Sequence, residues 1–218
     1  MELKKISEFY PNIKKNYSCL NLSEEMERGK NSDSSWGSAL SLSLEETLEY
    51  CQKQNSFVPS AGLFFSIMKT TIDKKTLLDL DNYWHRTSTI IVFPTKSKGY
   101  ILHYPKIKNG KLVRKNGIIE AEITIPLEKQ EIPKYGTIAT IKEYPKFFEK
   151  LLGKHKNKKY NTEINLWIPT KKCVLESPER LVIFGGFIQY GMGIWLTSNS
   201  KDKTLVGKRP FKTAQLKK

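Results

Sequence analysis

The sequence predicts an α+β fold that is predominantly antiparallel β, a bent meander sheet with two short helices packed on it. Three observations lead to this prediction. Apolar runs rich in β-branched and aromatic residues follow one another between residues 87 and 142. Two Asn-Gly pairs lie among these runs, and two short segments outside them have the apolar spacing of helices. With further runs downstream, we expect a sheet of some eight to ten strands.

Four runs make up the predicted meander, at residues 87–94, 99–105, 117–126 and 136–142. Gly, Pro and Asn bound them, which is typical of strands joined by short turns. The pairs Asn109-Gly110 and Asn116-Gly117 lie between the second run and the third. Asn and Gly both tolerate a positive φ, so each pair predicts a two-residue hairpin turn.

The two predicted helices cover residues 44–54 and 145–152. A capping box precedes the first, because the Ser43 hydroxyl and the Glu46 carboxylate can each accept from an otherwise unpaired backbone N–H. The second helix begins with Pro145 and is followed by Gly153, which are favoured in the first turn and just past the end of a helix. Three acids at positions 45, 46 and 49 suit the helix dipole better than they suit a metal site.

Further strands are predicted at residues 60–69 and 163–168, and two more within 180–197. Residues 169–179 are expected to form a loop. Three regions follow from these elements: an N-terminal arm and polar loop over residues 1–42, a β-rich core domain over 43–200, and a basic C-terminal tail over 201–218.

The charge of the chain is strongly basic and unevenly distributed. Lys and Arg total 37 against 22 Asp and Glu, a formal net charge of +15, and the excess is confined to residues 91–120, 151–180 and 181–218. Such clustering is expected of a protein that binds phosphate backbones, whereas a generally lysine-rich composition is the alternative. We expect the main phosphate contacts at 154–160 and 201–218, and name as nucleic-acid-binding candidates Lys154, His155, Lys156, Lys158, Lys159, Tyr160, Tyr190, Lys208 and Arg209.

Residues 180–197 contain glycines at positions 185, 186, 191 and 193, interleaved with aromatic residues. Glycine within a strand marks a bulge, a bend or the close approach of another backbone, so a glycine-rich bend in the sheet is the favoured interpretation. With Phe187, Tyr190 and Met192, the segment also resembles the glycine-rich loop of the ferredoxin-like RNA-binding subunits of CRISPR complexes, where that loop approaches RNA. The resemblance is confined to this segment, because the hairpin meander departs from the helix-containing repeats of that family.

Catalytic motifs are sparse. The sequence contains no nucleophile elbow, no Walker A motif and no dinucleotide-binding glycine fingerprint. The Glu-x-Lys triplet of metal-dependent nucleases occurs only at residues 2–4, outside any predicted strand, and we expect no metal or other cofactor. Metal-independent RNA cleavage needs only a histidine as acid or base, for which His85, His103 and His155 are candidates. The three cysteines form no CxxC pair and predict reduced thiols.

No stretch approaches 18 consecutive apolar residues, and the N-terminus lacks the apolar run of a signal peptide. We therefore expect a cytoplasmic protein with no membrane partner. The predicted function is a non-enzymatic nucleic-acid-binding subunit of a larger complex, with RNA favoured over DNA and other protein subunits as partners. Two alternatives stay open: a small metal-independent RNA-processing enzyme with a histidine as acid and base, and a β-rich protein-interaction module.

Overall fold

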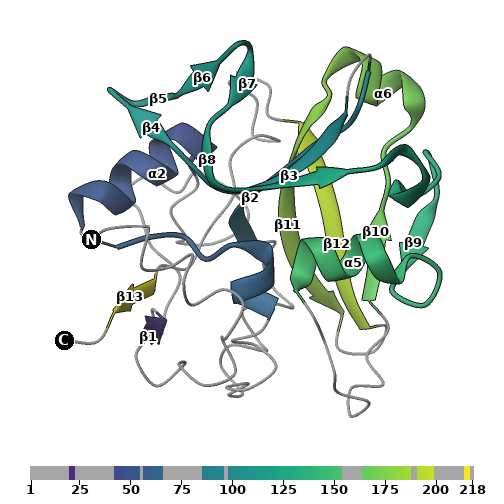
Figure 1. Ribbon diagram of the computed structural model, residues 1–218. Coiled ribbons are helices and arrows are strands. Elements are labelled where there is room, and N and C mark those ends of the chain that lie inside the picture. Colours follow the sequence, from purple (N-terminus) through teal and green to yellow (C-terminus); the bar gives the residue numbers. More distant parts are fainter. Residues whose placement is uncertain are drawn as a thin grey trace.

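The computed structural model describes residues 20–22, 42–54, 56–65, 85–95, 98–153, 164–187, 191–198 and 214–216. Seven strands form its central sheet: β2 (His85–Val92), β3 (Gly99–Pro105), β8 (Ala121–Leu127), β9 (Ile138–Thr140), β10 (Ile164–Trp167), β11 (Glu179–Phe187) and β12 (Gly191–Ser198). Their order across the sheet is β8-β3-β2-β11-β12-β10-β9 (Figure 1). All neighbours are antiparallel except β10 and β12, so the predicted α+β class with mainly antiparallel strands is confirmed.

Three of the four runs predicted as a meander do form one. Strand β3 pairs with β2 on one side and with β8 on the other. The fourth run forms β9, but this strand lies at the opposite edge of the sheet, beside β10. After β8 the chain enters the 3-10 turn η3 (Lys129–Glu131), and its backbone then bonds the segment after β10, with Gly136 N–H donating to the Pro169 carbonyl at 3.0 Å. These bonds carry the chain away from β8.

Both faces of the sheet are covered, which explains why its strands are apolar without strict alternation. On β2, Ile91 belongs to the larger core cluster with helix α5 (Pro145–Leu152), whereas Ile90 packs with Leu44 of helix α2 (Leu44–Lys53) on the other face. Neighbouring residues Ile101 and Leu102 of β3 divide between the same two clusters. In Figure 1, α5 crosses in front of β11 and β12, and α2 lies toward the β8 edge.

The two predicted helices are confirmed. At the start of α2, the Ser43 N–H donates to Glu46 Oε2 at 2.8 Å and the Glu46 N–H donates to Ser43 Oγ at 3.3 Å, which completes the capping box. Helix α5 begins at Pro145, ends before Gly153 at φ +85°, and buries Phe147, Phe148, Leu151 and Leu152.

Two other sequence predictions are wrong. Residues 61–65, expected in a strand at 60–69, are helical, and helix α6 (Lys171–Glu176) lies in the expected loop at 169–179. Side-chain caps start both helices, because the Leu63 N–H donates to Ser60 Oγ at 3.2 Å and the Cys173 N–H to Thr170 Oγ1 at 3.4 Å. Residues 61–65 are buried on every side, so apolar periodicity could not separate helix from strand.

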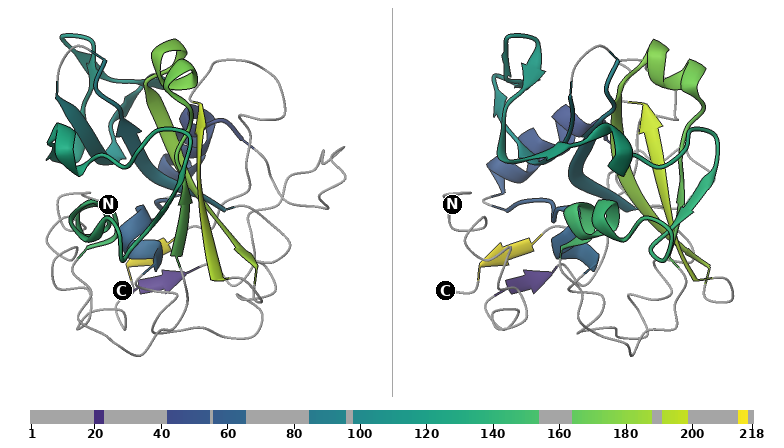
Figure 2. Two further views of the ribbon diagram at one scale, coloured as in Figure 1. Left: turned by 90° about the vertical axis from the view of Figure 1, so that its right-hand side faces the viewer. Right: turned by 45° about the vertical axis from the view of Figure 1, so that its right-hand side comes forward.

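The expected strands at 163–168 and within 180–197 are confirmed as β10, β11 and β12. Near the two ends of the chain, β1 (Leu20–Leu22) pairs antiparallel with β13 (Ala214–Leu216) (Figure 2). This pairing links the predicted arm and tail, whose boundaries stay predictions. None of the helices in the described ranges combines the length and the apolar character needed to cross a bilayer.

Candidate nucleic-acid interface

The nine candidate binding residues named from the sequence lie outside the residues that the structure describes. These are the run Lys154, His155, Lys156, Lys158, Lys159 and Tyr160, together with Tyr190, Lys208 and Arg209. Their role as phosphate or base contacts therefore stays a prediction. The structure nevertheless describes most of another basic segment, residues 91–120.

Residues 106–119, which we call the lysine hairpins, form two small hairpins between β3 and β8. The first joins β4 (Ile107–Lys108) to β5 (Lys111–Leu112), and the second joins β6 (Arg114–Lys115) to β7 (Ile118–Ile119). In the turns, Asn109 and Gly110 have φ +52° and +69°, and Asn116 and Gly117 have φ +53° and +79°. Positive φ at both central positions is the geometry of the tight two-residue turn that the Asn-Gly pairs predicted.

A closed ring of three backbone hydrogen bonds joins the two hairpins to the sheet. The Lys106 N–H donates to the Glu120 carbonyl at 2.8 Å, the Val113 N–H to the Lys106 carbonyl at 2.9 Å, and the Glu120 N–H to the Val113 carbonyl at 2.9 Å. The three residues are spaced by seven, and residues 106–112 and 113–119 carry Asn-Gly at the same two positions. This short repeat fixes where both turns project.

Helix α2 supports the first hairpin from beneath. Glu45 Oε1 accepts a hydrogen bond from the Leu112 N–H at 3.0 Å, and a Cβ at position 110 would lie 3.3 Å from Glu49 Oε2. Glu49 itself pairs with Lys53 at 3.1 Å. Glu45, which the sequence related only to the helix dipole, therefore also anchors the hairpin.

The lysine hairpins carry five cations and no acid. Arg114 is held by Glu179 through two hydrogen bonds of 2.6 and 2.7 Å, and these bonds raise the pKa of its guanidinium. Lys106 lies 3.9 Å from Glu122. The remaining three, Lys108, Lys111 and Lys115, are exposed and have no acidic partner within the described residues.

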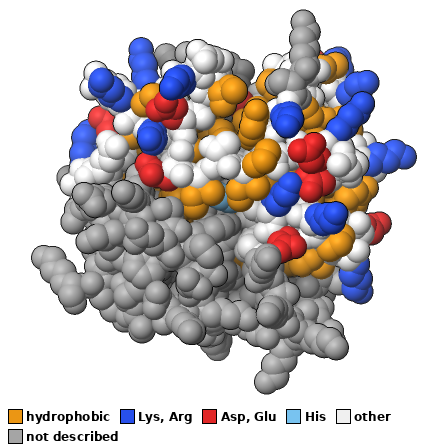
Figure 3. Space-filling model, in the orientation of Figure 1, with side chains coloured by type: hydrophobic (Ala, Val, Ile, Leu, Met, Phe, Trp, Pro, Cys, Tyr) orange, Lys and Arg blue, Asp and Glu red, His pale blue; other side chains and the backbone are white. Residues whose placement is uncertain are grey.

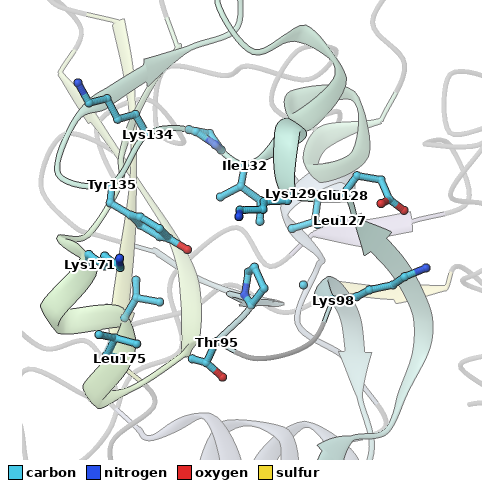
Figure 4. A pocket seen from close by; sticks show the side chains of 14 residues that line it. Thr95, Lys98, Leu127, Glu128, Lys129, Ile132, Lys134, Tyr135, Lys171 and Leu175 are labelled. Carbon is cyan, nitrogen blue, oxygen red and sulfur yellow. The ribbon is translucent and has the colours of Figure 1, made fainter.

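A second basic feature is a hollow of about 640 Å³ near the other end of β8, which we call the β8-end pocket. It is built by the loop between β2 and β3, the end of β8, η3 with the loop that follows, and α6 (Figure 4). Its lining residues are Pro94, Thr95, Lys98, Gly99, Leu127, Glu128, Lys129, Ile132, Pro133, Lys134, Tyr135, Lys171, Val174 and Leu175.

The β8-end pocket combines an apolar wall with a cationic rim. Four lysines line it against one acid, Glu128, and none of these lysines has an acidic partner in the described ranges. The Tyr135 ring packs on Phe93 with the centroids 5.7 Å apart, and burial raises the pKa of its hydroxyl. Leu175 of α6 is 59% exposed and adds an apolar side chain to the wall. Figure 4 shows Lys171 and Lys98 on opposite sides of the hollow.

The lysine hairpins and the β8-end pocket lie at the two ends of one edge strand. The register of β3 and β8 pairs Pro105 with Ala121 beside the hairpins and Gly99 with Leu127 beside the pocket. At about 3.3 Å per residue, these ends are separated by roughly 20 Å. On the face shown in Figure 3, Lys and Arg side chains gather over β4–β7 and again toward the opposite side.

Two of the three histidines proposed as acid–base candidates, His85 and His103, lie in the core. His103 is fully buried on β3, and Thr89 Oγ1 lies 2.8 Å from its Nδ1. Burial lowers the pKa of His103 to about 3, although a hydrogen bond to the Lys150 backbone favours the protonated ring. A general acid or base needs contact with substrate and a pKa near the working pH, so this geometry assigns His103 a structural role. His155 lies outside the described residues.

Its neighbour Tyr104 is also part of a buried hydrogen-bond network. The Tyr104 hydroxyl donates to Ser60 Oγ at 3.2 Å, and the backbone adopts φ +57°, which is rare for a residue with a large side chain. Burial raises the pKa of this hydroxyl. Tyr104 therefore connects the sheet to the segment at 60–65.

Within the described ranges, no group of three or more His, Cys, Asp and Glu side chains is arranged to hold a metal ion. Comparisons of the chain with protein-family models, with curated proteins and with solved structures found no match. The function proposed below is therefore argued from the charges and geometry of the chain itself.

Proposed function

We propose that the protein is a non-enzymatic nucleic-acid-binding subunit of a larger complex, with RNA favoured over DNA. The observation that carries the proposal is the acid-free pair of lysine hairpins, in which three exposed lysines have no acidic partner among the described residues. On a chain with a net charge of +15, clustered cations without acidic partners create a positive potential that attracts a polyanion. Phosphates spaced along a nucleic-acid strand supply that neutralisation, and the displaced counterions add to the affinity.

The backbone of the lysine hairpins favours binding to a charged surface. Their two turns and the ring of hydrogen bonds fix the direction in which Lys108, Lys111 and Lys115 leave the chain. A fixed backbone loses less conformational entropy on binding than a free loop, so the same number of ionic contacts gives a higher affinity.

Membership of a larger complex is supported by apolar side chains at exposed positions. Ile138 on the edge strand β9 is 50% exposed, and Ile118 on β7 is 44% exposed. An edge strand offers unpaired backbone groups to another chain, and exposed large apolar residues there are favourable contacts for a partner.

The test is a salt titration of binding to single-stranded RNA, single-stranded DNA and duplex DNA. In one variant Lys108, Lys111 and Lys115 become Gln. Its matched control changes Lys142, Lys146 and Lys172, which are exposed and lie outside both basic features, so that net charge falls equally. On a single strand each lost phosphate contact reduces the slope of log K against log salt by about 0.7, so the hairpin variant should lose roughly two units.

A third variant tests the basic run named from the sequence, by changing Lys154, Lys156, Lys158 and Lys159 to Gln. If it also reduces the slope, both segments contact phosphate. Equal losses in the hairpin variant and its control would mean that net charge alone is responsible, which contradicts a role for the lysine hairpins. No binding by the parent protein at low salt would overturn the proposed function.

A further inference from the structure

We propose that the β8-end pocket holds one unstacked nucleotide of a single strand, with its base against Tyr135 and its phosphate on the lysines of the rim. This inference rests on the proposed function and narrows it, because the protein would then prefer single-stranded to duplex nucleic acid. The lysine hairpins contact only phosphates in this arrangement, while the pocket contacts a base.

The size and lining of the pocket suit such an occupant. A volume of about 640 Å³ lies within the usual range for small-ligand sites, which bury a flat apolar body and orient it with a few polar groups. The apolar part of the wall includes Leu127, Ile132, Val174 and Leu175. The Tyr135 ring is half-buried and supported from behind by Phe93, so stacking on it would require little rearrangement.

The charge of the rim indicates that the bound molecule also carries a negative group. Lys98, Lys129, Lys134 and Lys171 line the pocket together with one carboxylate, that of Glu128. The ligand must therefore carry negative charge on an apolar or aromatic body, and a nucleotide has both. Continuity with the lysine hairpins favours a nucleotide over an acidic peptide, because a strand that leaves the pocket can reach them along roughly 20 Å of β8.

The same geometry discriminates against a duplex. Bases in a double helix are stacked and paired, so a base can enter a pocket only after it has been splayed out of the helix. A single strand does not carry that cost, and aromatic stacking tolerates any base because each has a π-face. We therefore expect the β8-end pocket to contribute to single-strand affinity and to contribute nothing to duplex affinity.

The experiment compares Tyr135→Leu with Tyr135→Phe, which keeps the ring, and adds Lys171→Gln as an exposed rim variant that spares the core. Dissociation constants are measured for a short single-stranded RNA, for the same strand with one abasic position, and for a duplex of the same sequence. Loss of one stacked base corresponds to about 5- to 150-fold weaker binding. We expect that loss for Tyr135→Leu on the intact strand, near-parent binding for Tyr135→Phe, and no change on the duplex.

An abasic site at the position that occupies the pocket should weaken binding by the parent, and should weaken Tyr135→Leu much less, because both changes remove the same contact. Thermal unfolding of each variant excludes loss of fold as the cause. If the parent binds the strand and all three variants bind equally well, the pocket inference is wrong while the proposed function stands. If the parent binds no nucleic acid, both are wrong. If an acidic peptide, rather than the strand, is the ligand that Tyr135→Leu loses, the assigned occupant is wrong.

Discussion

Polar side chains in the centre of β3 are buried and hydrogen-bonded, whereas those at the two ends of β8 are exposed and mostly unpaired among the described residues. In the centre, His103 and Tyr104 are buried, and each has a hydrogen-bond partner from another segment. At the ends, lysines are exposed, and most have no acidic partner in the described ranges. Buried polar groups without partners cost stability, whereas exposed cations cost little and remain free to bind. The difference separates the polar residues that hold the fold from those that can meet a ligand.

The largest effect expected from this comparison is a loss of stability in acid. The pKa of His103 is about 3 in the folded protein against an ordinary value of 6.5, because burial disfavours the charged ring. Between these values the unfolded chain binds a proton that the folded chain does not. The free energy of unfolding should therefore fall by about 1.4 kcal/mol for each pH unit between 6.5 and 3, on the order of 5 kcal/mol in total.

Denaturant titrations of the parent and of His103→Gln, from pH 7.5 to pH 4, measure this contribution. The variant should be less stable at neutral pH and should show a shallower dependence on pH, by about one proton. Above pH 6.5 the contribution of His103 is complete, and the two proteins should have parallel curves. Parallel curves at every pH would show that His103 titrates alike in the folded and unfolded chains.

The second prediction concerns the partner of His103. Thr89 Oγ1 accepts from the Ala61 N–H at 2.8 Å and contacts His103 Nδ1 at 2.8 Å. Thr89→Val keeps the shape of the side chain but leaves both groups without this partner, so we expect a loss of about 2–4 kcal/mol. Thr89→Ser keeps the hydroxyl and should lose less. Nucleic-acid binding by the folded variant should be unchanged, and a weakened salt slope would contradict the separation of the two regions.

The third prediction tests the turns of the lysine hairpins. Gly117 has φ +79° and open space around its α-carbon, so Gly117→Val introduces strain without a clash. We expect a loss of about 1–3 kcal/mol in the free energy of unfolding. Gly117→Asn is the control, because Asn adopts a positive φ more readily than Val. If thermal unfolding shows Val and Asn to be equally tolerated, the turn does not keep this geometry in solution.

The smallest effect should distinguish a paired cation from an unpaired one within the same hairpin. Arg114→Gln removes the contact with Glu179 and should cost at most about 1 kcal/mol of stability, since the pair is largely exposed. Lys115→Gln should not change stability. For RNA affinity we expect the opposite order, with a larger loss for Lys115→Gln than for Arg114→Gln, because Glu179 already neutralises Arg114. Equal affinity losses in the two variants would contradict this distinction.

Local structure was largely predictable from the sequence. The Asn-Gly turns, the capping box at Ser43 and Glu46, and the ends of α5 all depend on residues close together in the chain, and each was found where the sequence predicted it. The Ser60 and Thr170 caps are equally local, although the sequence predicted a strand and a loop at their helices. The position of β9 was not predictable in this way, because its pairing with β10 depends on backbone bonds between residues far apart in sequence.

The candidate site was predicted only in part. Charge density along the chain favoured residues 154–160, which the structure does not describe, over the less dense segment at 91–120. Which cations are free depends on distant acids such as Glu179, which pairs with Arg114, and sequence spacing does not reveal that contact. The β8-end pocket could not be predicted, since four separate segments supply its wall.

The ring of hydrogen bonds at Lys106, Val113 and Glu120 has a consequence for the order of folding. Residues 105 and 121 are joined by two hairpins that can each form within microseconds, because their contacts are local. Once these hairpins form, the loop that must close to pair β3 with β8 is effectively short, and the entropy lost in closing it is small. The pairing of β2 with β11 joins residues 92 and 179 and gains no such help. We therefore expect the β3–β8 edge to belong to the folding nucleus, so that Gly117→Val slows folding more than it speeds unfolding.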